Sequence, residues 1–127
     1  MTPGIVIFAH GSSVASANDA VREVAEAAAR NAPFQLFETA FLEGGRPDLR
    51  EAVDALVRKG ADPILVIPYF LTLGLHLQRD LPAIVRDISS IHKGVEIRVT
   101  PPLDGHPALA RILEDRARQA LASDGGT

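Results

Sequence analysis

Histidine is the strongest metal ligand that this sequence offers, because the chain contains four histidines and no cysteine. His10 directly follows the apolar run 5–9, and His76 lies in a leucine-rich segment after the apolar run 64–67. Neutral imidazole binds cobalt, nickel, iron and zinc, whereas a closed structural zinc site takes about four protein ligands. The sequence does not offer four strong candidates. The pair His10 and His76 therefore predicts a site that holds a divalent ion loosely and can pass it on.

Each candidate residue also has a plainer interpretation. A histidine at the end of a strand, such as His10, can simply hydrogen-bond a loop carbonyl, and His92, near the end of a helix, would compensate the helix dipole. Two histidines at the ligand-binding edge of one small sheet are an uncommon coincidence, which favours the metal interpretation for His10 and His76. Glu43 is the leading carboxylate, and the sequence leaves open whether it is a third ligand or base or a solvated turn residue.

Apolar runs alternate with amphipathic segments along the whole chain, a pattern typical of α/β proteins. The pattern predicts strands at 5–9, 34–41, 64–67 and 95–99, and helices at about 16–32, 47–59, 78–91 and 107–121. Right-handed crossovers between such units give a three-layer α/β/α sandwich in which helices cover both faces of a four-stranded parallel sheet. We expect one domain over residues 1–122 and a disordered tail at 123–127.

The composition of the runs predicts where each strand lies. The runs 5–9 and 64–67 are apolar on both faces, as in central strands of a parallel sheet, whereas Gln35 and Glu38 place the second strand at an edge. Ligands of such a sheet bind beyond the carboxyl ends of the strands. Five side chains that could bind a ligand follow these ends, namely His10, Glu43, His76, Asp104 and His106.

Leucines surround His76 in the sequence. Leu73, Leu75 and Leu77 suit a core as well as a ligand site, and those that stay exposed would suit a flat macrocycle or a partner subunit. Asp80 is expected to cap the following helix.

The bulk composition excludes several classes of partner. The formal net charge is -3 and the pI is about 5.7, which argues against a nucleic-acid or anionic membrane surface. No apolar run approaches the roughly 20 residues of a membrane helix, and the N-terminal run lacks the features of a signal peptide. We therefore expect a cytoplasmic protein.

Five segments of the chain, in order, resemble the CbiX-type sirohydrochlorin chelatases in their short, single-domain form. These segments are His10-Gly11-Ser12, residues 40–43, residues 66–71, residues 74–76 with 80–82, and residues 101–103 with 105–107. No single segment is specific, but five at these spacings, covering nearly the whole chain, are a strong signal.

The resemblance implies a chelatase-like fold and insertion of Co²⁺ or Fe²⁺, with Ni²⁺ as a further candidate, into sirohydrochlorin during cobalamin or siroheme synthesis. It implies that His10 and His76 bind the metal, which is a substrate and not a resident cofactor, and that the short form is a homodimer. Many relatives have arginine where this chain has Ser13. We therefore expect Arg46 and Arg79 to supply positive charge toward the carboxylates of the tetrapyrrole.

Metal insertion requires the macrocycle to lose two pyrrole protons while a partly desolvated ion approaches its face. We expect neutral His10 or His76 to accept a proton as the ion transfers, with Glu43 as a second acceptor. Ser12 and Ser13 would donate hydrogen bonds to the carboxylates, and Leu75 would contact the macrocycle.

Two other functions remain open. A tetrapyrrole or metal carrier of the same fold would bind its ligand without increasing the insertion rate. A flavodoxin-like binder of a phosphorylated ligand, or phosphohistidine chemistry at His10, ranks lower because the first strand–helix turn lacks a glycine-rich phosphate motif and a nearby arginine.

Overall fold

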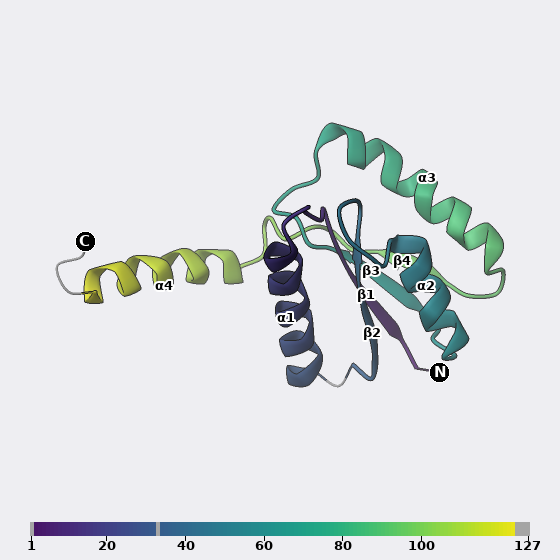
Figure 1. Ribbon diagram of the computed structural model, residues 1–127, viewed down its shortest axis with the longest axis horizontal. Helices are drawn as coiled ribbons and strands as arrows, with labels where there is room; N and C mark the ends of the chain where they lie inside the picture. The colour runs from purple at the N-terminus through teal and green to yellow at the C-terminus, as the bar shows by residue number, and fades with distance from the viewer. Residues whose placement is uncertain (1, 33, 124–127) are drawn as a thin grey trace.

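The structure is a computed structural model that describes residues 2–32 and 34–123. Its four strands form one parallel sheet in the order β2-β1-β3-β4. In chain order the elements are β1 (Gly4–Ala9), α1 (Ala15–Asn31), β2 (Leu36–Phe41), α2 (Leu49–Arg58), β3 (Ile64–Pro68), α3 (Leu75–Ile91), β4 (Ile97–Val99) and α4 (Ala108–Ala122). Helices α2 and α3 lie on one face of the sheet and α1 on the other (Figure 1). The predicted three-layer α/β/α sandwich is confirmed, with β1 and β3 inside and β2 at an edge.

The larger core lies between the sheet and the layer formed by α2 and α3. Val6 and Phe8 of β1 and Val66 of β3 pack there against Leu56 of α2 and Leu81 of α3. All of these side chains are buried. Because successive residues of a strand point to opposite faces, the residues between them point to the side of α1.

The two outer strands are shorter than the sequence predicts. β2 begins at Leu36 and β4 at Ile97, since these residues pair with Gly4 and Ile64, the first residues of the neighbouring strands. Pairing partners, and not the apolar pattern alone, thus set where a strand begins.

The third helix begins earlier than the sequence predicts, so that His76 lies in its first turn instead of in a loop. Its N-cap is Gly74, and the prediction that Asp80 caps this helix is wrong. The first helical hydrogen bond runs from the Gln78 N–H to the Gly74 carbonyl at 2.9 Å. A helix that begins without a capping side chain leaves no polar signal in the sequence. The sequence pattern therefore assigns this leucine-rich first turn to a loop.

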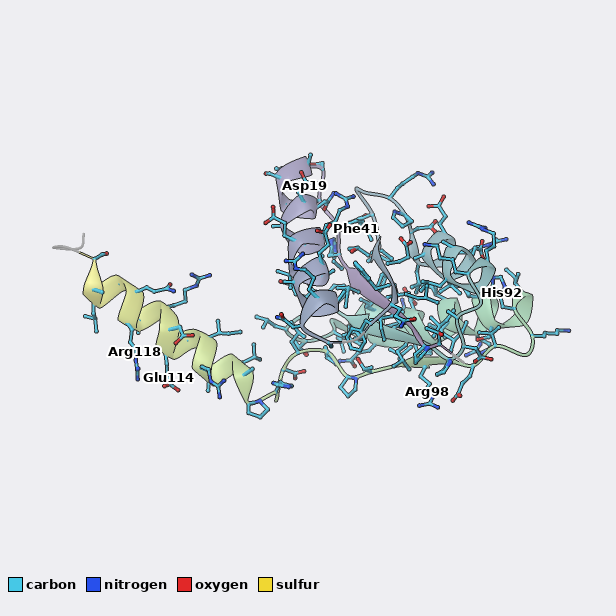
Figure 2. All side chains as sticks on the ribbon, turned by 90° about the horizontal axis from the view of Figure 1, so that it is seen from below. Asp19, Phe41, His92, Arg98, Glu114 and Arg118 are labelled. Carbon is cyan, nitrogen blue, oxygen red and sulfur yellow. The ribbon has the colours of Figure 1, made fainter. Side chains whose placement is uncertain are left out.

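The last helix corrects a second expectation. The sequence predicted helices that cover both faces of the sheet, but α4 extends away from it, and Figure 2 shows Glu114 and Arg118 far from the sheet. No residue of this helix, which is described throughout, is buried. The linker before α4 explains its direction, because the N–H groups of Leu103 and Asp104 donate to the carbonyls of Phe70 and Leu71 at 2.9 and 2.8 Å.

The sequence predicted a disordered C-terminal tail and no membrane-spanning helix. Ser123 is the C-cap of α4, and the rest of the predicted tail, residues 124–127, lies outside the described residues. Across the described parts of the chain, no helix is both long and apolar enough to span a bilayer.

His92 joins two helices. Besides its expected place at the C-terminal end of α3, its Nε2 lies 2.5 Å from Oδ1 of Asp54 on α2. The His92 and Asp54 side chains are 17% and 29% exposed, so water screens this contact only partly.

We expect His92→Ala to lower the free energy of unfolding by about 1 kcal/mol, because it leaves Asp54 partly buried without this hydrogen bond. Chemical denaturation of the purified variant measures the change. Lys93→Ala, at the neighbouring exposed position, is the control and should change stability by less than about 0.5 kcal/mol. Equal effects of the two substitutions would show that the contact between α2 and α3 contributes nothing.

Candidate metal centre

His10 lies one residue beyond β1, where the pairing of β1 with β2 continues. The N–H of Leu42 donates to the Ala9 carbonyl at 2.9 Å, and that of Glu43 donates to the His10 carbonyl at 3.0 Å. This parallel pairing places the two candidate side chains together, with Nε2 of His10 3.7 Å from Oε1 of Glu43. That separation is longer than a hydrogen bond, so both atoms remain accessible to a ligand.

The other ring nitrogen of His10 contacts the backbone. Its Nδ1 lies 3.2 Å from the carbonyl oxygen of Gly11. A carbonyl only accepts, so this contact favours a proton on Nδ1 and an unprotonated Nε2, the tautomer in which a histidine ligates metal through Nε2. The plainer role foreseen for His10 is therefore compatible with metal binding. Phe70 packs against the ring edge to face, with centroids 6.4 Å apart.

Gly11 allows the loops after β1 and β2 to approach each other. Its φ is +88°, and a Cβ at this position would lie 1.7 Å from the carbonyl oxygen of Glu43. Only glycine adopts this φ without strain and leaves room for the carbonyl oxygen of Glu43. The glycine after His10 therefore keeps the imidazole beside Glu43.

Asn18 is a positioning residue that the sequence analysis missed. This α1 side chain is only 6% exposed. Its Oδ1 accepts from the Ser12 N–H at 3.0 Å, and its Nδ2 donates to the carbonyls of Ser12 and Gly44 at 2.9 and 3.0 Å. One amide thus ties together the loops that carry His10 and Glu43. One feature of the sequence does indicate that Asn18 is buried. Its spacing from Val21 and Ala25 places it on the side of the helix that faces the sheet.

His76 reaches the site from the first turn of α3. Arg79, one turn later, places Nη2 3.3 Å from Nδ1 of His76 and Nε 3.1 Å from Oδ1 of Asp80. A guanidinium only donates, so Nδ1 of His76 is the acceptor and carries no proton in this arrangement. Divalent ions bind unprotonated ring nitrogens, and Arg79 therefore occupies a position that an ion could take.

A cleft of about 340 Å³ brings both histidines together. Its lining residues are His10, Leu42, Phe70, Gly74, Leu75, His76, Leu77, Asp80 and Ile84. Two of its apolar side chains are exposed, with Leu42 39% and Leu75 84% accessible. Two imidazoles within an apolar, open rim are suited to presenting an ion to a flat apolar ligand.

The other candidate residues lie around this cleft or apart from it. Glu43 lies beside the cleft because it contacts His10, and Arg79 lies beside it because it contacts His76. The remaining three lie outside the lining of the cleft: the Ser12 hydroxyl accepts from the Val14 N–H at 3.0 Å, Ser13 is exposed, and Arg46 pairs with Glu51 at 2.5 Å.

Asp104 and His106 belong to a different hollow. They lie in the linker before α4, around a space of about 360 Å³ next to Ile67 of β3. Among the described residues, no three or more histidine and acidic side chains gather closely enough to enclose a metal ion. The ligands that the structure offers in the cleft are therefore His10 and His76, with Glu43 beside the first.

Comparisons with known proteins find relatives along nearly the whole chain. The family model described as CbiX matches residues 4–120. The sirohydrochlorin cobaltochelatase of Sulfolobus acidocaldarius is 32% identical over 122 residues, covering 96% of this chain and 95% of its own length. The chloroplastic sirohydrochlorin ferrochelatase of Arabidopsis thaliana is 29% identical, covering 94% of this chain and 53% of its own length.

Solved structures share the fold. A CbiX protein from Marinobacter aquaeolei VT8 is 29% identical and superimposes with a TM-score of 0.84, covering 95% of this chain and 98% of its own. The sirohydrochlorin chelatase SirB from Bacillus subtilis subspecies spizizenii, solved in complex with cobalt, is 24% identical with a TM-score of 0.86, covering 94% of this chain and 51% of its own. The match of the family model over nearly all of the sheet and its helices shows that this chain belongs to the CbiX family.

Proposed function

We propose that this chain is a sirohydrochlorin chelatase, a lyase-class enzyme that inserts Co²⁺ or Fe²⁺ into the macrocycle. The observation that carries the proposal is that His10, after β1, and His76, in the first turn of α3, line one open cleft with an apolar rim. Relatives that cover nearly the whole chain are sirohydrochlorin cobaltochelatases and a ferrochelatase. The metal is a substrate, and Ni²⁺ is a third candidate.

The reaction exchanges two pyrrole protons for one divalent ion. In our proposal Nε2 of His10 and a ring nitrogen of His76 hold the ion and leave its other positions to water and then to pyrrole nitrogens. Glu43, 3.7 Å from His10, accepts one of the released protons, and the imidazole freed by the departing ion accepts the other.

Arg79 links the tetrapyrrole to the metal site in this proposal. Its guanidinium contacts Nδ1 of His76 while the ligand is absent. A carboxylate of sirohydrochlorin is a better partner for arginine than a neutral imidazole. Binding of the macrocycle would therefore draw Arg79 away and leave the lone pair of Nδ1 to the ion.

The other proposed contacts lie around the opening. Ser12 and Ser13, at the N-terminal side of α1, and Arg46 would bind substrate carboxylates, and Leu75 would pack on the macrocycle. We further propose that residues 1–122 act as one chelatase unit, that the protein is a cytoplasmic homodimer, and that it binds neither nucleic acid nor membranes. A second copy would cover the part of so wide a ligand that one cleft leaves open.

Spectrophotometric insertion assays test the activity. The purified protein, mixed with sirohydrochlorin and separately with Co²⁺, Fe²⁺ and Ni²⁺, should convert the absorbance spectrum to that of the metal complex faster than the spontaneous reaction. A typical enzyme would complete about 1 turnover per second or more. His92→Ala, which removes a histidine outside the cleft, is the control and should insert metal at the wild-type rate.

The same assay distinguishes the alternative function. A carrier would bind sirohydrochlorin or the ion without accelerating insertion with any of the three metals. Binding without acceleration would therefore contradict the chelatase proposal and support the carrier.

A further inference from the structure

Asp80 is the acidic side chain of the cleft that both histidines line. Of the described residues that line this cleft, it alone carries a carboxylate, because Glu43 lies beside His10 and outside the lining. The Asp80 side chain is 53% exposed, and it does not cap α3, the role that the sequence predicted for it. The cleft therefore contains a carboxylate that has no function in the mechanism proposed above.

Asp80 and His76 lie on the same side of α3. They are four residues apart in this helix, and side chains at that spacing are neighbours, with Cβ atoms about 5–6 Å apart. Both line the same cleft. Each histidine of the site thus has a carboxylate near it. Glu43 lies beside His10 across two loops, and Asp80 follows His76 one helical turn later.

Arg79 contacts Asp80 and His76 together. Its Nε lies 3.1 Å from Oδ1 of Asp80, and its Nη2 lies 3.3 Å from Nδ1 of His76. The Arg79 side chain is 72% exposed, and an ion pair as open to water as this one is weak. A carboxylate of the tetrapyrrole can therefore displace it. When the guanidinium turns to the substrate, it frees the Asp80 carboxylate and the His76 imidazole at the same time.

Metal insertion needs a base that does not hold the metal. While an imidazole binds the ion, its lone pair is occupied and cannot accept a proton. A pyrrole nitrogen must lose its proton before its own electron pair can bind the ion. A free carboxylate is therefore available earlier in the reaction than the histidine that the departing ion leaves behind.

We propose that Asp80 accepts the second pyrrole proton, on the His76 side of the cleft, as Glu43 accepts the first on the His10 side. In this step a pyrrole N–H bond breaks, an O–H bond forms at Asp80, and the electron pair left on nitrogen binds the incoming ion. Water then removes the proton from Asp80, and His76 stays neutral and can hold the next ion. This role of Asp80 rests on the proposed chelatase function and extends it.

Steady-state insertion of Co²⁺ into sirohydrochlorin tests the role of Asp80. Asp80→Asn keeps the shape of the side chain but removes the base, so kcat should fall by about 10²-fold without an increase in KM for sirohydrochlorin. Asp87→Asn is the matched control, because it removes the same charge from an exposed position of α3 outside the cleft. It should insert metal at the wild-type rate. Equal kcat values for the two variants would overturn the proposal.

Chemical rescue distinguishes a proton acceptor from a metal ligand. Asp80→Ala leaves space for a small carboxylate, so formate should restore part of kcat to this variant in proportion to its concentration, and should not accelerate Asp87→Ala. Thermal unfolding of both variants should match that of the wild type, because both side chains are exposed. Absence of rescue would overturn the proposal. So would a higher KM for Co²⁺ with unchanged kcat in Asp80→Asn, which would make Asp80 a metal ligand.

Failure of this role and failure of the chelatase activity give different results. If the wild-type protein inserts metal and Asp80→Asn does so equally fast, the chelatase function stands and Asp80 is not a base. If the wild-type protein does not accelerate insertion, both proposals are wrong.

Discussion

His10→Ala and His76→Ala are each expected to lower kcat/KM for metal insertion by about 10²–10⁴-fold, because in the proposed mechanism each removes a metal ligand that also accepts a proton. Neither change should disturb folding. The His10 side chain is 61% exposed and His76 lies on the exposed side of the first turn of α3. Steady-state insertion of Co²⁺ into sirohydrochlorin, with thermal unfolding of the same samples, measures both effects.

The double variant tests whether the two histidines act on the same ion. Residues that act on one ion do not contribute independently, so His10→Ala with His76→Ala should be little slower than either single variant. Exogenous imidazole should restore part of the rate to the single variants if the missing ring acts as ligand or base. Wild-type insertion by the double variant would remove both histidines from the mechanism and leave the cleft without a metal site.

Gly11→Ala is expected to slow insertion strongly and to destabilise the protein. A side chain at φ +88° is strained, and the added methyl group would lie 1.7 Å from the carbonyl oxygen of Glu43. The loops after β1 and β2 must therefore separate, which breaks the hydrogen bond from the Glu43 N–H to the His10 carbonyl. His10 then loses its place beside Glu43, and even a displacement of about 1 Å can reduce a rate by about 10²-fold.

Gly60→Ala is a matched control for the backbone conformation. Its φ is +87°, but nothing lies within 4 Å of the added methyl group. We expect Gly60→Ala to lower the free energy of unfolding by about 1–2 kcal/mol and to leave insertion unchanged. Gly11→Ala should cost about 1–3 kcal/mol more, because it adds the collision to the same strain. If denaturation gives equal losses for the two, the contact between the loops is not tight and the positioning role assigned to Gly11 is wrong.

The arrangement of helix α4 bears on how the cleft works. The linker that directs α4 outward is bound to the carbonyls of Phe70 and Leu71, and Phe70 packs against the ring of His10. The loop after β3 therefore contacts both the linker that directs α4 and the imidazole of His10.

The sequence by itself determined the order of the elements and the edge at which the chemistry lies. Local signals were sufficient there: apolar runs for 5–9 and 64–67, and polar Gln35 and Glu38 for an edge strand, each act within a few residues. Because parallel strands all end at one edge, the positions of His10, Glu43 and His76 after their strands were enough to predict that they gather there.

Tertiary structure alone decided how these side chains meet. The role of Asn18 depends on a hydrogen bond to Gly44, 26 residues away along the chain, which no local pattern records. The start of α3 at Leu75 has no capping side chain, and the direction of α4 follows from hydrogen bonds between the linker and the loop after β3. Periodicity shows which side of a helix is apolar, but the surface that side will cover depends on contacts distant in sequence.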